Sequence, residues 1–187
     1  MKTKSLLATL VAPLLLAVSL GAQAQAKLVP AQSELAFEAK QMGVPVDGHF
    51  KHFDAQLAFD AAKPAAAQVA FTVDMASATI GAPEYDAELV KADWFNAAKL
   101  PQATFKSTAF KALGNGRYEV AGTLTIKGQS KPVTVPVTLA KAGATTIATG
   151  AVPIKRLDFK IGEGDWADTS VVADAVTVKF KLAFTGI

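Results

Sequence analysis

His49 and His52 are the two histidines of the chain, and their side chains could serve as general bases or imidazole metal ligands near neutral pH. They are three residues apart in a segment whose alternation predicts a strand, so they point to opposite faces. That spacing is poor for a metal pair. A Ser-His-Asp triad would have to use one of them, and no G-x-S-x-G nucleophile elbow accompanies them. Because the chain contains no cysteine, thiol nucleophiles are excluded.

Acidic residues gather in one further place, where Glu163, Asp165 and Asp168 surround Trp166. No histidine stands near them in the sequence, and the group is typical of a polar loop with one aromatic anchor. The glycine pair in Gly114-Asn115-Gly116 predicts a hairpin turn rather than a phosphate-binding loop, because no helix follows it. We therefore predict a protein that is not an enzyme and that has no catalytic residues, no metal and no cofactor.

The charge balance excludes a second class of function. The 187-residue chain carries 19 Lys+Arg against 16 Asp+Glu, a net charge of +3. Lys2 and Lys4 belong to an N-terminal segment that we expect to be removed, which leaves 17 − 16 = +1. No run of basic residues stands out in the remainder. Nucleic acid is therefore not an expected partner.

The N-terminal segment has the layout of a secretory signal peptide: a positive start, an apolar run over 6–20 and then small-residue cleavage sites. A membrane anchor is the alternative, but the apolar run is shorter than the ~20 residues that span a bilayer. We predict a signal peptide over 1–26, with cleavage after Ala26, or after Ala24 as the second choice. Residues 27–187 then form one domain, and we expect it in the periplasm.

The stretch from Tyr118 to Leu139 shows the pattern that most of this domain repeats. Its two runs place apolar residues at every second position, which predicts strands with one buried face. The segment Gly128–Pro132 between the runs predicts the turn of an antiparallel hairpin. Gly122 lies on the inward parity, which predicts a bend, a bulge or the close approach of another group.

Two irregular segments interrupt the alternation. The apolar parity flips at Lys51-His52, which predicts a β-bulge there. The segment Ala82–Leu100 loses the period of two, and its spacings favour one or two short helices, with Asp93 as the N-cap of the second. About eight strands and this insert predict an all-β fold with a short helical insert, arranged as an eight-stranded antiparallel β-barrel. A two-sheet sandwich is the alternative.

Phenylalanines are frequent on the inward parity, and such a barrel is either filled by its own side chains or hollow enough to hold one ligand. Periodicity leaves this choice open. If the barrel is hollow, the expected ligand-binding residues are inward-facing ones from most of its strands. They are Phe37, Phe50, Phe53, Phe59, Phe71, Val73, Phe105, Leu124, Ile126, Val178 and Phe180.

Several segments in order resemble the YceI-like family of periplasmic lipid- and polyisoprenoid-binding proteins. They are VDGHFKHFDAQLAFD, AFTVDMASATI, DAELVKADWFNAAKLPQATFKS, VAGTLTIKGQSKPVTVPVTL and the ending KRLDFKIG…VADAVTVKFKL. The resemblance covers essentially 27–187. The segment Ile154–Trp166 departs from the family's commoner R-x-x-F-G-I pattern, since lysine follows the phenylalanine.

This resemblance implies a lipocalin-like barrel that sequesters or carries a long-chain amphiphile, either a polyisoprenoid or a fatty acyl lipid. It names no catalytic residue. The alternative is a rigid accessory or partner-binding module of a membrane redox or stress-response system. The identity of the lipid, a transient contact with the inner membrane or a membrane protein, a homodimer and the role of the loop 162–168 are left open.

Overall fold

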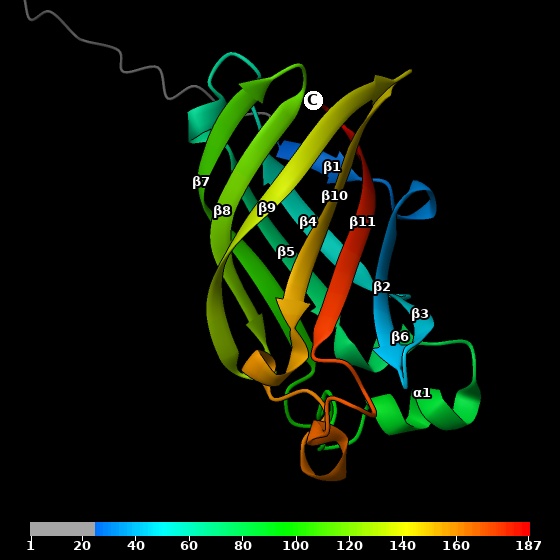
Figure 1. Ribbon diagram of the computed structural model, residues 1–187. Coiled ribbons are helices and arrows are strands. Elements are labelled where there is room, and N and C mark those ends of the chain that lie inside the picture. Colours follow the sequence, from blue (N-terminus) through cyan, green and yellow to red (C-terminus); the bar gives the residue numbers. More distant parts are fainter. Residues whose placement is uncertain (1–24) are drawn as a thin grey trace, which may run out of the picture.

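The computed structural model describes residues 25–187, which form a closed antiparallel barrel with eight strand positions and one short α-helix at one end (Figure 1). The predicted signal peptide therefore lies almost wholly outside the described residues. Three of the eight positions are divided into two shorter strands, and the β1–β11 pairing closes the barrel. The strands are β1 Gln25–Leu28, β2 Glu34–Gln41, β3 Val44–Phe50, β4 Phe53–Ala58, β5 Gln68–Asp74, β6 Ala78–Thr79, β7 Gln102–Gly114, β8 Arg117–Ile126, β9 Gln129–Ala142, β10 Thr145–Lys155 and β11 Ala175–Thr185.

The central hairpin forms as predicted, but its turn is shorter. Lys127 and Gly128 make a two-residue turn with φ of 48° and 73°, and β9 already begins at Gln129. Positive φ at both turn residues gives the twist that neighbouring antiparallel strands need. The predicted turn over 128–132 was therefore too long, because Gln129 pairs directly with Ile126.

The predicted bulge near Lys51-His52 is instead a complete break between β3 and β4. β3 pairs with β2 and β6, whereas β4 pairs with β1 and β5. Ser77 seals the break: its carbonyl oxygen accepts from the Lys51 N–H at 3.1 Å, and its hydroxyl accepts from the His52 N–H at 3.0 Å. The flip in parity is real, since Phe50 and Phe53 both pack against the core.

A β-bulge occurs elsewhere, in β7, where the register with β8 shifts between Ser107 and Ala109. Before the bulge Phe105 points into the barrel, so strict alternation along the strand would also point Ala109 inward. The bulge reverses this parity. Ala109 is exposed, and Phe110, opposite Val120, turns into the barrel.

The helical insert contains one α-helix, α1 (Pro83–Leu89), and not two. Pro83 occupies the first turn, where its missing N–H has no intrahelical partner to lose. The chain then continues in turns, so Asp93 is not an N-cap. Its carbonyl oxygen instead accepts from the N–H groups of Gly162 (2.8 Å) and Glu163 (2.9 Å). Within residues 25–187, no helix is long and apolar enough to cross a membrane.

The buried side chains form two clusters along the barrel. One contains residues such as Leu35, Met75 and Phe159, and it includes the helical insert. The other contains residues such as Leu57 and Phe184 and lies around β1, β4 and the C-terminal end of β11. Phe53, Phe71 and Phe180 pack against both clusters, so they lie where the clusters meet.

Candidate ligand cavity

The barrel encloses a cavity in which the centre of a water-sized sphere can occupy about 250 Å³. One water molecule needs only about 10–15 Å³ by the same measure, so the space is far larger than a packing defect. All eight strand positions contribute side chains to its wall, as do α1 and the loop before β11. Apart from Thr104, Tyr118, Arg156 and the indole of Trp94, every lining residue is apolar.

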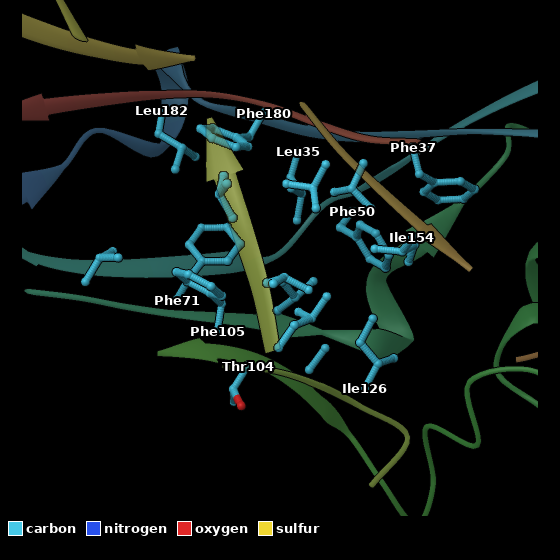
Figure 2. A pocket seen from close by; sticks show the side chains of 18 of the residues that line it. Leu35, Phe37, Phe50, Phe71, Thr104, Phe105, Ile126, Ile154, Phe180 and Leu182 are labelled. Carbon is cyan, nitrogen blue, oxygen red and sulfur yellow. The ribbon is translucent and has the colours of Figure 1, made fainter. Parts of the chain in front are cut away.

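The cavity is lined by ten of the eleven residues that the sequence analysis proposed: Phe37, Phe50, Phe59, Phe71, Val73, Phe105, Leu124, Ile126, Val178 and Phe180. Figure 2 shows several of them converging from opposite sides of the barrel, with the hydroxyl of Thr104 turned away. Their contact with a ligand stays a prediction. Phe53 does not line the cavity. Its ring lies 5.8 Å from that of Phe71, and it borders a separate outer hollow beside the strand break.

Three inward-facing glycines explain how a barrel with so many phenylalanines stays hollow. The ring of Phe37 lies directly over Gly48, that of Phe180 over Gly150 and that of Phe105 over Gly122. A Cβ atom at these glycines would come within 2.2, 2.3 and 2.5 Å of the respective rings. Each ring therefore occupies the place of a missing side chain on the neighbouring strand. The close approach predicted at Gly122 is confirmed.

The end of the barrel that carries α1 is closed by a buried arginine that sequence reasoning missed. Arg156 is only 2% exposed, and its guanidinium donates five hydrogen bonds, all to backbone carbonyl oxygens. Burial lowers the pKa of Arg156, and nearby Asp174 opposes that shift. The donors and their acceptors are Nε to Ala173 (3.1 Å), Nη1 to Ile161 (2.9 Å) and Gly162 (3.0 Å), and Nη2 to Trp166 (2.7 Å) and Val172 (2.7 Å).

Lys127 is a second buried cation at this end, 7% exposed although it belongs to a hairpin turn. Its Nζ donates to the carbonyl oxygens of Lys160 (2.7 Å) and Asp93 (3.3 Å) and to Glu163 Oε2 (2.9 Å). The rings of Trp94 and Trp166 meet nearby, with centroids 5.4 Å apart. Lys127 and Arg156 thus tie the turns after α1 to the loop before β11.

Neither cation carries a motif that could have revealed its role. In the sequence Lys127 is an ordinary turn residue, and Arg156 is distinguished only as the arginine of the family's R-x-x-F-G-I pattern. The departure from that pattern places a non-glycine residue in a strained backbone conformation. Lys160, where the pattern has glycine, adopts the left-handed conformation with φ of 56°, which glycine reaches without strain. Its carbonyl oxygen is one of the acceptors for Lys127.

The residues first considered for chemistry lie in two separate places, the histidines on β3 and in the strand break and the carboxylates in the loop around Trp166. His49 and His52 are both exposed, and His52 Nδ1 lies 3.7 Å from Asp74 Oδ2. Asp165 and Asp168 belong to the loop around Trp166, and the carboxylate of Glu163 accepts a hydrogen bond from Lys127. Within the described part of the chain, no three His, Cys, Asp or Glu side chains come together as metal ligands would.

The Lys127–Glu163 pair predicts a pH dependence of stability. The hydrogen bond and charge of Lys127 hold the pKa of Glu163 below its ordinary value of 4.5. The unfolded chain therefore binds more protons below that value, so this contribution is complete above it and is lost as the pH falls through the folded pKa. The Glu163 side chain is 47% exposed, so water screens the pair and its contribution is at most ~1 kcal/mol. At about pH 7, Glu163→Gln should therefore lower Tm by up to roughly 2–4 °C.

The Tm values of the wild-type protein and Glu163→Gln should converge as the pH falls through the folded pKa of Glu163, because the protonated carboxyl is then uncharged like the amide. Thermal unfolding followed by circular dichroism measures both. Asp165→Asn is the matched control, since Asp165 lies in the same loop without this partner. A Tm difference for Glu163→Gln that persists undiminished at the lower pH would contradict the assignment.

Together, the closed antiparallel barrel, the apolar cavity and the sealed end define a lipocalin-like protein. The chain belongs to the YceI-like domain family, which matches residues 27–184. Among solved structures it is similar to BcnA of Burkholderia cenocepacia, with 46% identity, a TM-score of 0.81 and coverage of 84% of this chain and 99% of that one. The YCEI protein of Campylobacter jejuni is 26% identical, with a TM-score of 0.67 over 74% of this chain and 83% of that one.

A polyisoprenoid-binding domain from Saccharophagus degradans shares the fold, with a TM-score of 0.69 over 88% of this chain and 99% of that one. Its 16% identity supports no more than that. A UPF0312 protein of Ectopseudomonas mendocina is 41% identical over 88 residues, which are 47% of this chain and 46% of that protein. The chain thus spans about half the length of this curated relative.

Proposed function

We propose that this protein is a non-enzymatic binding protein that sequesters or carries one long-chain amphiphile, a polyisoprenoid or fatty acyl lipid, inside the barrel. The observation that carries the proposal is the apolar cavity of about 250 Å³ lined from all eight strand positions. Removing apolar surface from water is worth roughly 25 cal/mol per Å², so a long chain gains more than a short one. The wall offers few polar groups, and a head group would find few partners there.

Charged groups near the cavity are already occupied, which supports tail recognition over head-group recognition. All five donors of Arg156 are held by backbone carbonyl oxygens, and Lys127 is held by two carbonyl oxygens and Glu163. Binding should therefore depend on chain length and be nearly independent of salt.

A thermal-shift experiment with delipidated protein tests this function. A ligand that binds only the folded state adds about 2.7 kcal/mol at a hundredfold excess over Kd. A long polyprenyl alcohol at that excess should then raise Tm by roughly 5–10 °C, since each kcal/mol moves Tm by about 2–4 °C. A five-carbon prenyl alcohol is the control and should do far less. If prenyl and fatty acyl compounds of all lengths leave Tm unchanged, the protein is better explained as a partner-binding module.

Periplasmic location and carriage between membranes are part of the same proposal. Exchange with a bilayer would require transient contact with the inner membrane or a membrane protein. The signal peptide stays a prediction, and the strand pairing favours its second cleavage choice. Gln25 and Ala26 pair with Ala58 and Leu57 in β4, and Ala26 is buried. Cleavage after Ala24 would keep this pairing, and the intact mass of the exported protein tests it.

A further inference from the structure

The wall of the barrel is incompletely paired between β9 and β10. From their shared hairpin the two strands pair only as far as Val137 and Gly150. Both continue further, but there β9 pairs only with β8, and β10 only with β11. Figure 1 shows the two strands diverging below the point where they cross, with the orange turn Arg156–Phe159 near the lower end. We call the facing stretches 132–136 and 151–155 the β9–β10 seam.

Two prolines of β9 lie where this strand would donate to β10. The N–H of Leu139 donates to the carbonyl oxygen of Gly116 at 2.7 Å, on the β8 side. Successive N–H groups of a strand alternate between its two neighbours, and the β8–β9 register is continuous. The amides of even-numbered residues of β9 therefore face β10. Pro132 and Pro136 are two of these residues, and neither has an N–H to donate.

A third proline occupies the opposite edge of the seam. Extending the β9–β10 register beyond Val137 and Gly150 places Pro153 opposite Thr134. Residues that face each other in an antiparallel ladder point their amides toward each other when the pair is hydrogen-bonded. Because the Thr134 amide points to β10, the nitrogen of Pro153 points to β9, but it carries no hydrogen to donate. Each facing pair of the seam therefore lacks one of its two N–H donors, and pairing stops next to Pro136. Proline at such positions prevents a ladder from extending and also prevents a foreign strand from adding.

The side chains of the seam form an apolar path between the cavity and the outside. Val133, Val152 and Ile154 line the cavity but are only half-buried, whereas Val135 of the same stretch is buried. On the outer face, the exposed residues of the seam are uncharged apart from Lys155; the uncharged ones are Pro132, Thr134, Pro136, Ala151 and Pro153. The break between β3 and β4 differs, because Ser77 seals it with hydrogen bonds.

We propose that the β9–β10 seam is the entry port through which a lipid tail passes sideways into the cavity. The inference rests on the proposed lipid-binding function. A flexible acyl or prenyl chain can slide between two strands that are not hydrogen-bonded to each other, whereas the α1 end is held by the bonds of Arg156 and Lys127. The prolines keep the port from closing without requiring any rearrangement of the barrel.

Bridging the seam tests this port, and the absence of native cysteine makes the chemistry selective. Thr134→Cys/Pro153→Cys would be joined across the seam by a short bis-maleimide. Thr138→Cys/Thr149→Cys, treated identically, is the matched control, because these exposed residues face each other in the paired part of the same two strands. Uptake and release of cis-parinaric acid, a fluorescent polyene fatty acid, would be followed by stopped-flow fluorescence.

The seam bridge should slow both uptake and release at least tenfold, with little change in Kd, while the control bridge changes neither rate by more than about twofold. Equal rates in both bridged proteins, with binding intact, would overturn the port and leave the proposed function standing. If the unmodified protein binds neither this probe nor a polyprenyl alcohol, the proposed function fails and the port fails with it.

A second variant needs no cross-linker. Pro136→Val/Pro153→Thr restores a donor on each edge and should allow the ladder to extend. We expect slower uptake of cis-parinaric acid and slower hydrogen exchange at Thr134 and Lys155, whose amides face across the seam. Pro45→Val, an exposed proline of β3 outside the seam, is the control. Faster or unchanged uptake in a variant whose exchange shows an extended ladder would overturn the port.

Discussion

Replacing Arg156 with methionine is expected to lower the free energy of unfolding by about 3–5 kcal/mol, because buried carbonyl oxygens would lose their donor. The guanidinium bonds five carbonyl oxygens, and they belong to residues between Ile161 and Ala173. This loop contains no strand, so it depends on the arginine for its shape. In a domain of this size the loss corresponds to a fall in Tm of roughly 6–20 °C.

Urea titration measures the change, with Lys155→Met as the matched control. Lys155 is the preceding residue, is exposed, and should tolerate the same substitution within about 0.5 kcal/mol. Arg156→Lys should remain strongly destabilising, because an ammonium group keeps the charge but lacks the planar five-donor arrangement. If Arg156→Met costs less than about 1 kcal/mol, the loop is held by other contacts and our account of the closed end is wrong.

Phe180→Asp should cost about 3–5 kcal/mol and should also abolish the thermal shift by long-chain ligands. Phe180 faces the cavity, lies opposite Gly150 and Leu35, and packs against both core clusters. An aspartate there would leave Gly150 uncovered and place an unpaired carboxylate in an apolar space. Protonation of the carboxyl would reduce the penalty without restoring the lost contacts.

Phe180→Leu and Lys181→Asn separate the effect of charge from those of size and position. Leucine keeps the site apolar and should cost clearly less than aspartate. Lys181 is the next residue and points to solvent, so its substitution should change stability by no more than about 0.5 kcal/mol. Urea titration and the thermal shift with a polyprenyl alcohol are measured on all three variants. Similar losses for Phe180→Asp and Lys181→Asn would show that the inward parity of β11 is misassigned.

The sequence by itself determined the features that depend on alternation along one strand. It predicted the antiparallel barrel, the central hairpin, the inward face of β11 and ten of the residues that line the cavity. Alternation is a local property, because successive side chains of a strand point to opposite faces. It fails where the strand is irregular, which is why the break at Lys51-His52 and the bulge that turns Phe110 inward were misread or missed.

Only the tertiary structure decided whether the barrel is filled or hollow. The answer depends on which residue lies opposite each phenylalanine, and strand register brings Phe37 against Gly48 and Phe180 against Gly150. The tertiary structure likewise decided that Arg156 and Lys127 are buried. The oxygen atoms that accept their hydrogen bonds lie in segments that are distant in the chain, for Lys127, or that carry no sequence motif, for Arg156. The prolines of β9 and β10 are visible in the sequence. The pairing of the folded strands alone shows that these prolines lie on the sides of β9 and β10 that face each other.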